Sequence, residues 1–162
     1  AFDETGMPDL VEKYVKTGRV SFEFRNYVRD GLDVAMALVA RCGGEAQFFP
    51  LTEALFKSQK DLFQQVQSAP PEQQQALSQS PQGYGQLAGL QQWAAQRGLP
   101  SARSGACLAD QNEANRVVQM TTDASTQYPD FRGTPSFTIN GKLLDDTANW
   151  DTLEPKLREA IG

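Results

Sequence analysis

The sequence predicts an α/β protein in which a block of helices separates an early strand from a late β-hairpin. Residues 20–25 alternate apolar and polar side chains, which is the period of a half-buried strand. Near the C-terminus, Asn140-Gly141 lies between two short apolar runs and is a strong hairpin-turn signal. Residues 31–127 carry almost only helical patterns. We therefore expect a helical domain, 31–127, inserted into a small α/β unit made of 1–30 and 128–162.

The first elements are a kinked helix, the strand and a capped helix. Apolar residues recur at helical spacing, namely Met7, Leu10, Val11, Tyr14 and Val15. Pro8 interrupts this pattern, and Gly18 closes it. After the strand, Asp30 can cap a helix that ends at Gly43-Gly44.

The later helices are separated by Pro, Gly and Gln-rich breaks. We expect a long helix over 46–66, then either a solvated loop or a weak helix over 67–82. One helix is expected from Tyr84 to Ala94, and another near 110–127. The last helix begins between Asn149 and Thr152, and Pro155 fits its first turn if Thr152 is the N-cap.

Composition and charge exclude several classes of function. The 162 residues carry a net charge of −5, which argues against a nucleic-acid or anionic-membrane surface. No apolar run is long enough to span a bilayer. Histidine is absent, so Ser-His-Asp catalysis, Cys-His nucleophiles and histidine metal sites are excluded within these residues, and two cysteines cannot form a Cys-rich zinc site.

The run from Gly133 to Lys142, Gly-Thr-Pro-Ser-Phe-Thr-Ile-Asn-Gly-Lys, resembles the cis-proline loop and closing hairpin of the DsbA-like thiol:disulfide oxidoreductases. Ala1-Phe2-Asp3-Glu4 is similar to the stretch that follows the second cysteine of that family's Cys-Pro-His-Cys motif. The resemblance implies a thioredoxin-like fold with an inserted helical subdomain. It also implies that the central first strand and the Cys-x-x-Cys pair directly precede Ala1 and are absent from the chain.

The resemblance assigns substrate binding to Gly133, Thr134 and Pro135, with a cis bond between Thr134 and Pro135. The plain alternative is a trans proline that opens an edge strand. Asp3 and Glu4 would be acidic residues that tune a cysteine just upstream, or else an ordinary solvated first turn.

Cys42 and Cys107 are 65 positions apart and match positions where some family members carry a non-catalytic pair. Three interpretations remain open: a structural disulfide, two buried thiols or a reactive site. Neither cysteine has an adjacent Lys or His, although Arg41 precedes Cys42, so a thiolate of low pKa is not indicated. A disulfide would imply an oxidising compartment.

The function implied by the resemblance is disulfide exchange with substrate proteins or peptides, without a cofactor or metal, in the periplasm or another exported location. A membrane redox partner is a further expectation, while nucleic acid and membrane insertion are not expected. Residues 1–162 alone are predicted to be inactive because they lack the redox pair. The alternatives are a non-redox thioredoxin-fold module that binds peptides, or a glutathione-transferase-like relative. The phenylalanines at 48, 49, 56 and 63 are interpreted as core residues, with an aromatic peptide groove as the lesser reading.

Overall fold

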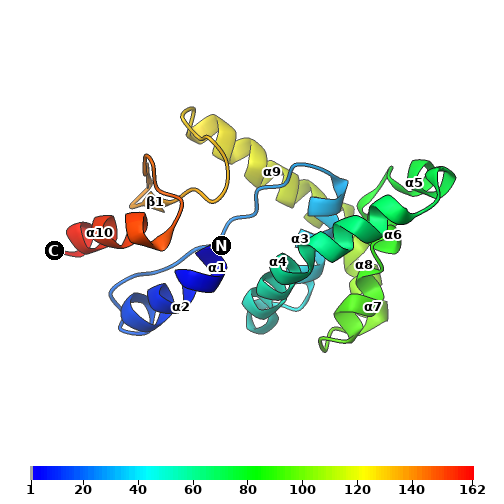
Figure 1. Ribbon diagram of the computed structural model, residues 1–162, viewed down its shortest axis with the longest axis horizontal. Helices are drawn as coiled ribbons and strands as arrows, with labels where there is room; N and C mark the ends of the chain where they lie inside the picture. The colour runs from blue at the N-terminus through cyan, green and yellow to red at the C-terminus, as the bar shows by residue number, and fades with distance from the viewer. Residues whose placement is uncertain (1) are drawn as a thin grey trace. The chain divides into compact units, whose positions relative to one another are not determined.

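The computed structural model describes residues 2–162, which form two compact units (Figure 1). The first, here called the hairpin unit, consists of Ala1–Arg25 and Asp123–Gly162. The second, the helical unit, consists of Asn26–Thr122. The helical unit is thus inserted in the sequence between the two parts of the hairpin unit.

The hairpin unit combines short N-terminal helices, a two-stranded sheet and the C-terminal helix. Helices α1 (Phe2–Thr5) and α2 (Met7–Leu10) are followed by a π-helical turn, η1 (Val11–Val15). Strands β1 (Thr138–Ile139) and β2 (Lys142–Leu143) pair antiparallel, and α10 (Trp150–Ile161) follows. The core of the unit is formed by three buried side chains, with partly buried apolar residues around them: Leu10, Tyr14 and Leu157.

The prediction of a β-strand over residues 20–25 is wrong. Within the part of the chain that the structure describes, this stretch has no regular secondary structure, and the sheet holds only β1 and β2. A β-strand is defined by backbone hydrogen bonds to a neighbour, and alternation of side chains cannot supply that neighbour. Val20 and Phe22 nevertheless pack as partly buried residues against the core of the hairpin unit, as their spacing indicates.

Seven helices account for most of the helical unit, the last of them continuing past its boundary: α3 (Gly31–Cys42), α4 (Glu45–Ser68), α5 (Pro71–Leu77), α6 (Pro81–Leu87), α7 (Leu90–Ala95), α8 (Ser101–Leu108) and α9 (Gln111–Gln127). Helix α3 contacts α4, α6, α7 and α8, and eight of its twelve residues are buried. It is therefore the central helix of this unit. Its N-cap is Asp30, as predicted, and the Asp30 carboxylate accepts the Asp33 N–H at 2.9 Å.

Two helix boundaries differ from those predicted. The single helix expected from Tyr84 to Ala94 is divided into α6 and α7, because Gly89 has a φ of 63° in the left-handed region, where a helix cannot continue. Asn149, and not Thr152, is the N-cap of α10. The Asn149 carboxamide accepts the Thr152 N–H at 3.0 Å, so Pro155 lies inside the helix and not in its first turn.

Of the two alternatives for the segment 67–82, a solvated loop or a weak helix, the structure has the helix. A two-turn helix, α5, starts at Pro71, where the missing N–H costs nothing at the first helical position. The Gln74 carboxamide donates to the carbonyls of Gln67 and Ala69 at the end of α4, at 3.1 and 2.6 Å. The weak helix is thus attached to the C-terminus of its neighbour.

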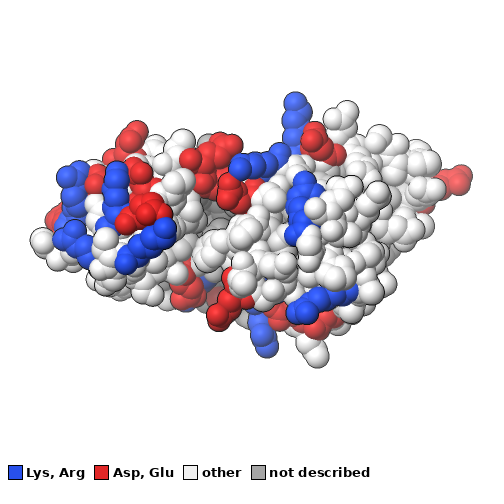
Figure 2. All heavy atoms as spheres, turned by 90° about the horizontal axis from the view of Figure 1, so that it is seen from below, with Lys and Arg blue, Asp and Glu red and all other residues white. Residues whose placement is uncertain are grey.

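Acidic and basic side chains are interspersed on the face of the molecule in Figure 2. Several pair one helical turn apart, as Lys13 does with Asp9 at 2.8 Å and Lys57 with Glu53 at 2.6 Å. Among the described residues, no helix combines the length and the apolar character needed to cross a bilayer.

Candidate functional site

The segment that links α9 to β1 is a short turn around Gly133, Thr134 and Pro135. The peptide bond between Thr134 and Pro135 is cis, and Gly133 has a φ of 142°, which a side chain would disfavour. The Ser136 hydroxyl donates to the Gly133 carbonyl and closes the turn. Thr134, Pro135 and Ser136 are all exposed. The turn therefore presents its backbone and small side chains to solvent.

A regular β-hairpin follows this turn in the sequence. Thr138 pairs with Leu143 and Ile139 with Lys142, while the Leu144 N–H donates to the Phe137 carbonyl at 2.9 Å. Asn140 and Gly141 have φ values of 50° and 81°, which confirms the predicted two-residue turn with positive φ at both positions.

The start of the chain lies beside the residue that follows this turn. The ring of Phe2 in α1 packs edge-on against the ring of Phe137, with centroids 4.7 Å apart. Gly6 allows this approach, since a Cβ at that position would lie 2.5 Å from the Phe2 ring and 3.0 Å from Trp150 Cβ. Two segments far apart in sequence, α1 and the turn at Pro135, are thereby brought together.

Asp3 and Glu4 lie in the first turn of α1, next to Phe2. Asp3 is half-buried and Glu4 is exposed, and their acidic charge suits the positive end of a helix. Ala1, the first residue of the predicted Ala1-Phe2-Asp3-Glu4 motif, lies outside the described residues, as does the expected Cys-x-x-Cys pair.

A partly buried polar pair in the hairpin unit was missed by the sequence interpretation, which treated Tyr14 as an apolar helix residue. Tyr14 is only 5% exposed, and its hydroxyl donates to Glu154 Oε1 at 2.8 Å. This hydrogen bond, followed by burial, raises the pKa of Tyr14. Arg158 holds the other carboxylate oxygen of Glu154 at 2.7 Å. No spacing rule links residues 140 positions apart, so only the fold could show the pair.

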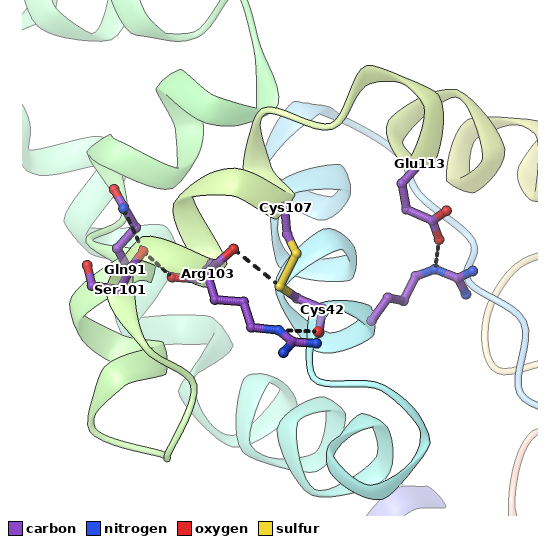
Figure 3. Close-up of a disulfide and its surroundings, with 8 residues drawn as sticks. Cys42, Gln91, Ser101, Arg103, Cys107 and Glu113 are labelled. Atoms are coloured by element: carbon purple, nitrogen blue, oxygen red, sulfur yellow. Dashed lines mark hydrogen bonds and ion pairs between the residues drawn. A yellow bond between two sulfur atoms is a disulfide. The ribbon is translucent and has the colours of Figure 1, made fainter.

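The two cysteines form a disulfide within the helical unit (Figure 3). Cys42 is the last residue of α3 and Cys107 lies in α8, with Cα atoms 5.9 Å apart. The Arg103 guanidinium donates to the Cys42 carbonyl at 3.3 Å, and Arg41 pairs with Glu113 at 2.6 Å. Of the three interpretations, the structure has the disulfide, and it crosslinks two packed helices.

Residues 2–162 contain no group of three or more His, Cys, Asp or Glu side chains that could hold a metal ion. The turn at Pro135 offers backbone groups, hydroxyls and an aromatic neighbour. These groups suit recognition of an extended peptide, whereas covalent chemistry would require a nucleophile from elsewhere.

Comparison with known proteins agrees with this geometry. The family model described as thioredoxin matches residues 1–159. A protein named "Putative protein-disulfide oxidoreductase" from Rickettsia bellii is 26% identical over 140 residues, which cover 86% of this chain and 47% of the relative. A relative of the same kind from Rickettsia conorii is 25% identical over 162 residues, which cover 99% of this chain and 51% of the relative. The chain thus spans about half the length of these relatives.

A solved structure is also similar. The crystal structure of protein-disulfide isomerase from Novosphingobium aromaticivorans superposes with a TM-score of 0.87 at 27% identity, covering 99% of this chain and 84% of that one. The likeness confirms the predicted thioredoxin-like fold. The chain belongs to the thioredoxin family, and the relatives to which it is similar are named as putative protein-disulfide oxidoreductases.

Proposed function

We propose that the protein exchanges disulfides with substrate proteins, using a Cys-x-x-Cys pair that directly precedes Ala1. In this exchange a substrate thiolate attacks one sulfur of the oxidised pair and forms a mixed disulfide. The second substrate thiolate then releases the substrate as a disulfide and leaves the pair reduced. The reverse sequence reduces a substrate disulfide. The names of the relatives, which specify protein-disulfide oxidoreduction, support this chemistry.

The observation that carries the proposal is the contact between Phe2 and Phe137. Cysteines immediately upstream of residue 1 would emerge next to Phe2, whose ring lies 4.7 Å from that of Phe137. Phe137 is two residues after Pro135, so the redox pair would lie close to the exposed backbone of Thr134. The turn and the pair would then form the two halves of one site.

In this site, Gly133, Thr134 and Pro135 bind the substrate. The exposed backbone of Thr134 pairs with an extended substrate segment as a short added strand, which aligns the substrate sulfur with the pair. Asp3 and Glu4, in the first turn of α1, are acidic groups that tune a cysteine just upstream of Ala1.

We also place the protein in the periplasm or another exported compartment, where a membrane redox partner returns the pair to its starting state. The disulfide between Cys42 and Cys107 supports an oxidising compartment.

The test compares the full-length protein with residues 1–162 in an insulin-reduction assay. Full-length protein should turn over, whereas a variant lacking the first upstream cysteine and the isolated 162 residues should not. Thr134→Arg should lower the rate by roughly tenfold, because the added side chain obstructs the peptide path. Thr126→Arg, an exposed position of α9, is the matched control and should keep the wild-type rate.

An upstream sequence without Cys-x-x-Cys, together with absent turnover, would favour the non-redox peptide-binding module. Family-like rates from residues 1–162 alone would refute the need for an upstream pair, since both cysteines in that segment are bonded to each other.

A further inference from the structure

A cavity in the helical unit contains none of the residues of the candidate site. It has a volume of about 310 Å³ and lies between the start of α3, the turn from α5 to α6, and the first half of α9. The size is at the lower end of that of small-ligand sites. The cavity belongs wholly to one unit, and an inference drawn from it does not rest on the proposed function.

Close packing fixes the turn between α5 and α6 beside this cavity. Gly31 lies against the Tyr84 ring, where a Cβ would approach to 2.4 Å. Gly83 lies so close to the Leu77 carbonyl that a Cβ would be 1.8 Å from its oxygen. The Ser80 hydroxyl fixes the start of α6 by accepting the Gly83 N–H at 3.0 Å. These contacts leave the turn between α5 and α6 little freedom, so the cavity is preorganised.

The lining combines polar and apolar side chains and contains no Asp, Glu, Lys, Arg or His. Hydroxyl- or carboxamide-bearing side chains come from six residues: Ser78, Gln79, Ser80, Tyr84, Gln111 and Asn115. The apolar part comes from Val34 and Ala114, which are buried, and from Val118, which is 47% exposed. The site thus offers hydrogen-bond donors and acceptors beside an apolar strip.

The carboxamides on α9 are arranged for a ligand that both donates and accepts. Gln111 Nε2 donates to Asn115 Oδ1 at 2.9 Å. That bond leaves the Gln111 oxygen as an acceptor and the Asn115 nitrogen as a donor, one helical turn apart. A peptide group presents the complementary pair, a carbonyl and an N–H.

The surrounding charges disfavour an anionic ligand. Helices α3 and α9 begin beside the cavity, but each start is already capped by a carboxylate. Asp30 accepts the Asp33 N–H, and Asp110 accepts the Glu113 N–H at 3.0 Å. A charged group of either sign in the cavity would find no Asp, Glu, Lys, Arg or His in the lining to pair with. An uncharged ligand needs no such partner.

We propose that this cavity binds a neutral polar peptide segment, held by hydrogen bonds to the carboxamides of Gln111 and Asn115 and by contact with Val118. The apolar strip accommodates the small side chains, while the hydroxyls and carboxamides pair with the peptide groups.

The test is an ¹H–¹⁵N NMR titration of the full-length protein. The probe is a capped tetrapeptide of serine, asparagine, glutamine and alanine; matched peptides carry one lysine or one aspartate in place of the glutamine, and glucose serves as a non-peptide arm. We expect saturable shifts confined to the cavity residues with the neutral peptide, and roughly tenfold weaker binding for each charged peptide.

Asn115→Trp, at an exposed position on the cavity wall, should fill the site and weaken binding of the neutral peptide by roughly tenfold or more. Asn112→Trp is the matched control on the same helix, outside the lining, and should bind as the wild type does. The proposal is overturned by equal binding of charged and neutral peptides, by glucose binding in place of peptide, by an unaffected Asn115→Trp, or by no saturable shift. None of these outcomes depends on disulfide exchange.

Discussion

Reduction of the disulfide between Cys42 and Cys107 should destabilise the helical unit by about 4 kcal/mol. The two residues are 65 positions apart. In the chain-entropy model a loop of this length removes about 14.5 cal/mol/K from the unfolded chain, which is about 4.3 kcal/mol at 25 °C. Since single domains are stabilised by about 5–15 kcal/mol, this is a large share of the total.

The assay is urea unfolding of residues 1–162, with and without reductant, followed by tryptophan fluorescence. The chain has two tryptophans, so a Trp150→Phe background leaves Trp93, in α7, as a reporter of the helical unit. With a slope of about 2 kcal/mol/M, the reductant should lower the urea midpoint by about 2 M. Cys42→Ala/Cys107→Ala is the control, and reductant should leave its midpoint unchanged.

A loss below about 1 kcal/mol on reduction would refute this reasoning, because the unfolded chain would then gain little freedom from the open loop. It would mean that residual structure already keeps the two segments close in the unfolded state. A reductant effect of equal size on the alanine double variant would show that the midpoint shift does not report the disulfide.

Single substitutions test three other contacts. The pKa of Tyr14 is raised in the folded state, so the hydroxyl contributes stability below about pH 10, and this contribution is lost as the pH rises through the folded-state pKa. Tyr14→Phe removes the hydrogen bond to Glu154 and should therefore flatten the alkaline fall in unfolding free energy measured in urea. An unchanged slope would contradict this. Asn149→Ala should cost about 1 kcal/mol in the same measurement through loss of the α10 cap, whereas Asn149→Asp should stay close to wild type. Gly83→Ala should cost about 1–3 kcal/mol in thermal unfolding because its Cβ would meet the Leu77 carbonyl, and a neutral result would show that the turn yields.

Features set by neighbouring residues could be predicted from the sequence. The φ preference of Asn140 and Gly141 belongs to those two residues, so their turn could be predicted without knowledge of the fold. The Asp30 cap likewise depends on one side chain and the N–H three residues on. The Gly133–Lys142 run was identified because a local motif encodes both the turn at Pro135 and the hairpin.

Features that depend on distant partners could not be predicted in the same way. Alternation over residues 20–25 predicted which of its side chains are partly buried, but the ladder requires a second strand. The helix expected from Tyr84 to Ala94 kept its periodicity across Gly89, since a single residue in the left-handed region hardly alters a hydrophobic pattern. Tyr14 was treated as purely apolar because the local spacing does not show the distant partner of its hydroxyl. Its ring does contribute to the core, and only the hydroxyl has a polar partner.

The candidate site combines both kinds of feature. The turn at Pro135 is closed by local contacts, because Ser136 donates to Gly133 and the hairpin strands pair with each other. The approach of α1 depends instead on a long-range aromatic contact, between Phe2 and Phe137, and on the missing side chain of Gly6. If the turn at Pro135 binds substrate as proposed, its local closure would suit both disulfide exchange and plain peptide binding. The identity of the residues before Ala1 therefore decides between the two functions without any change in the fold described here.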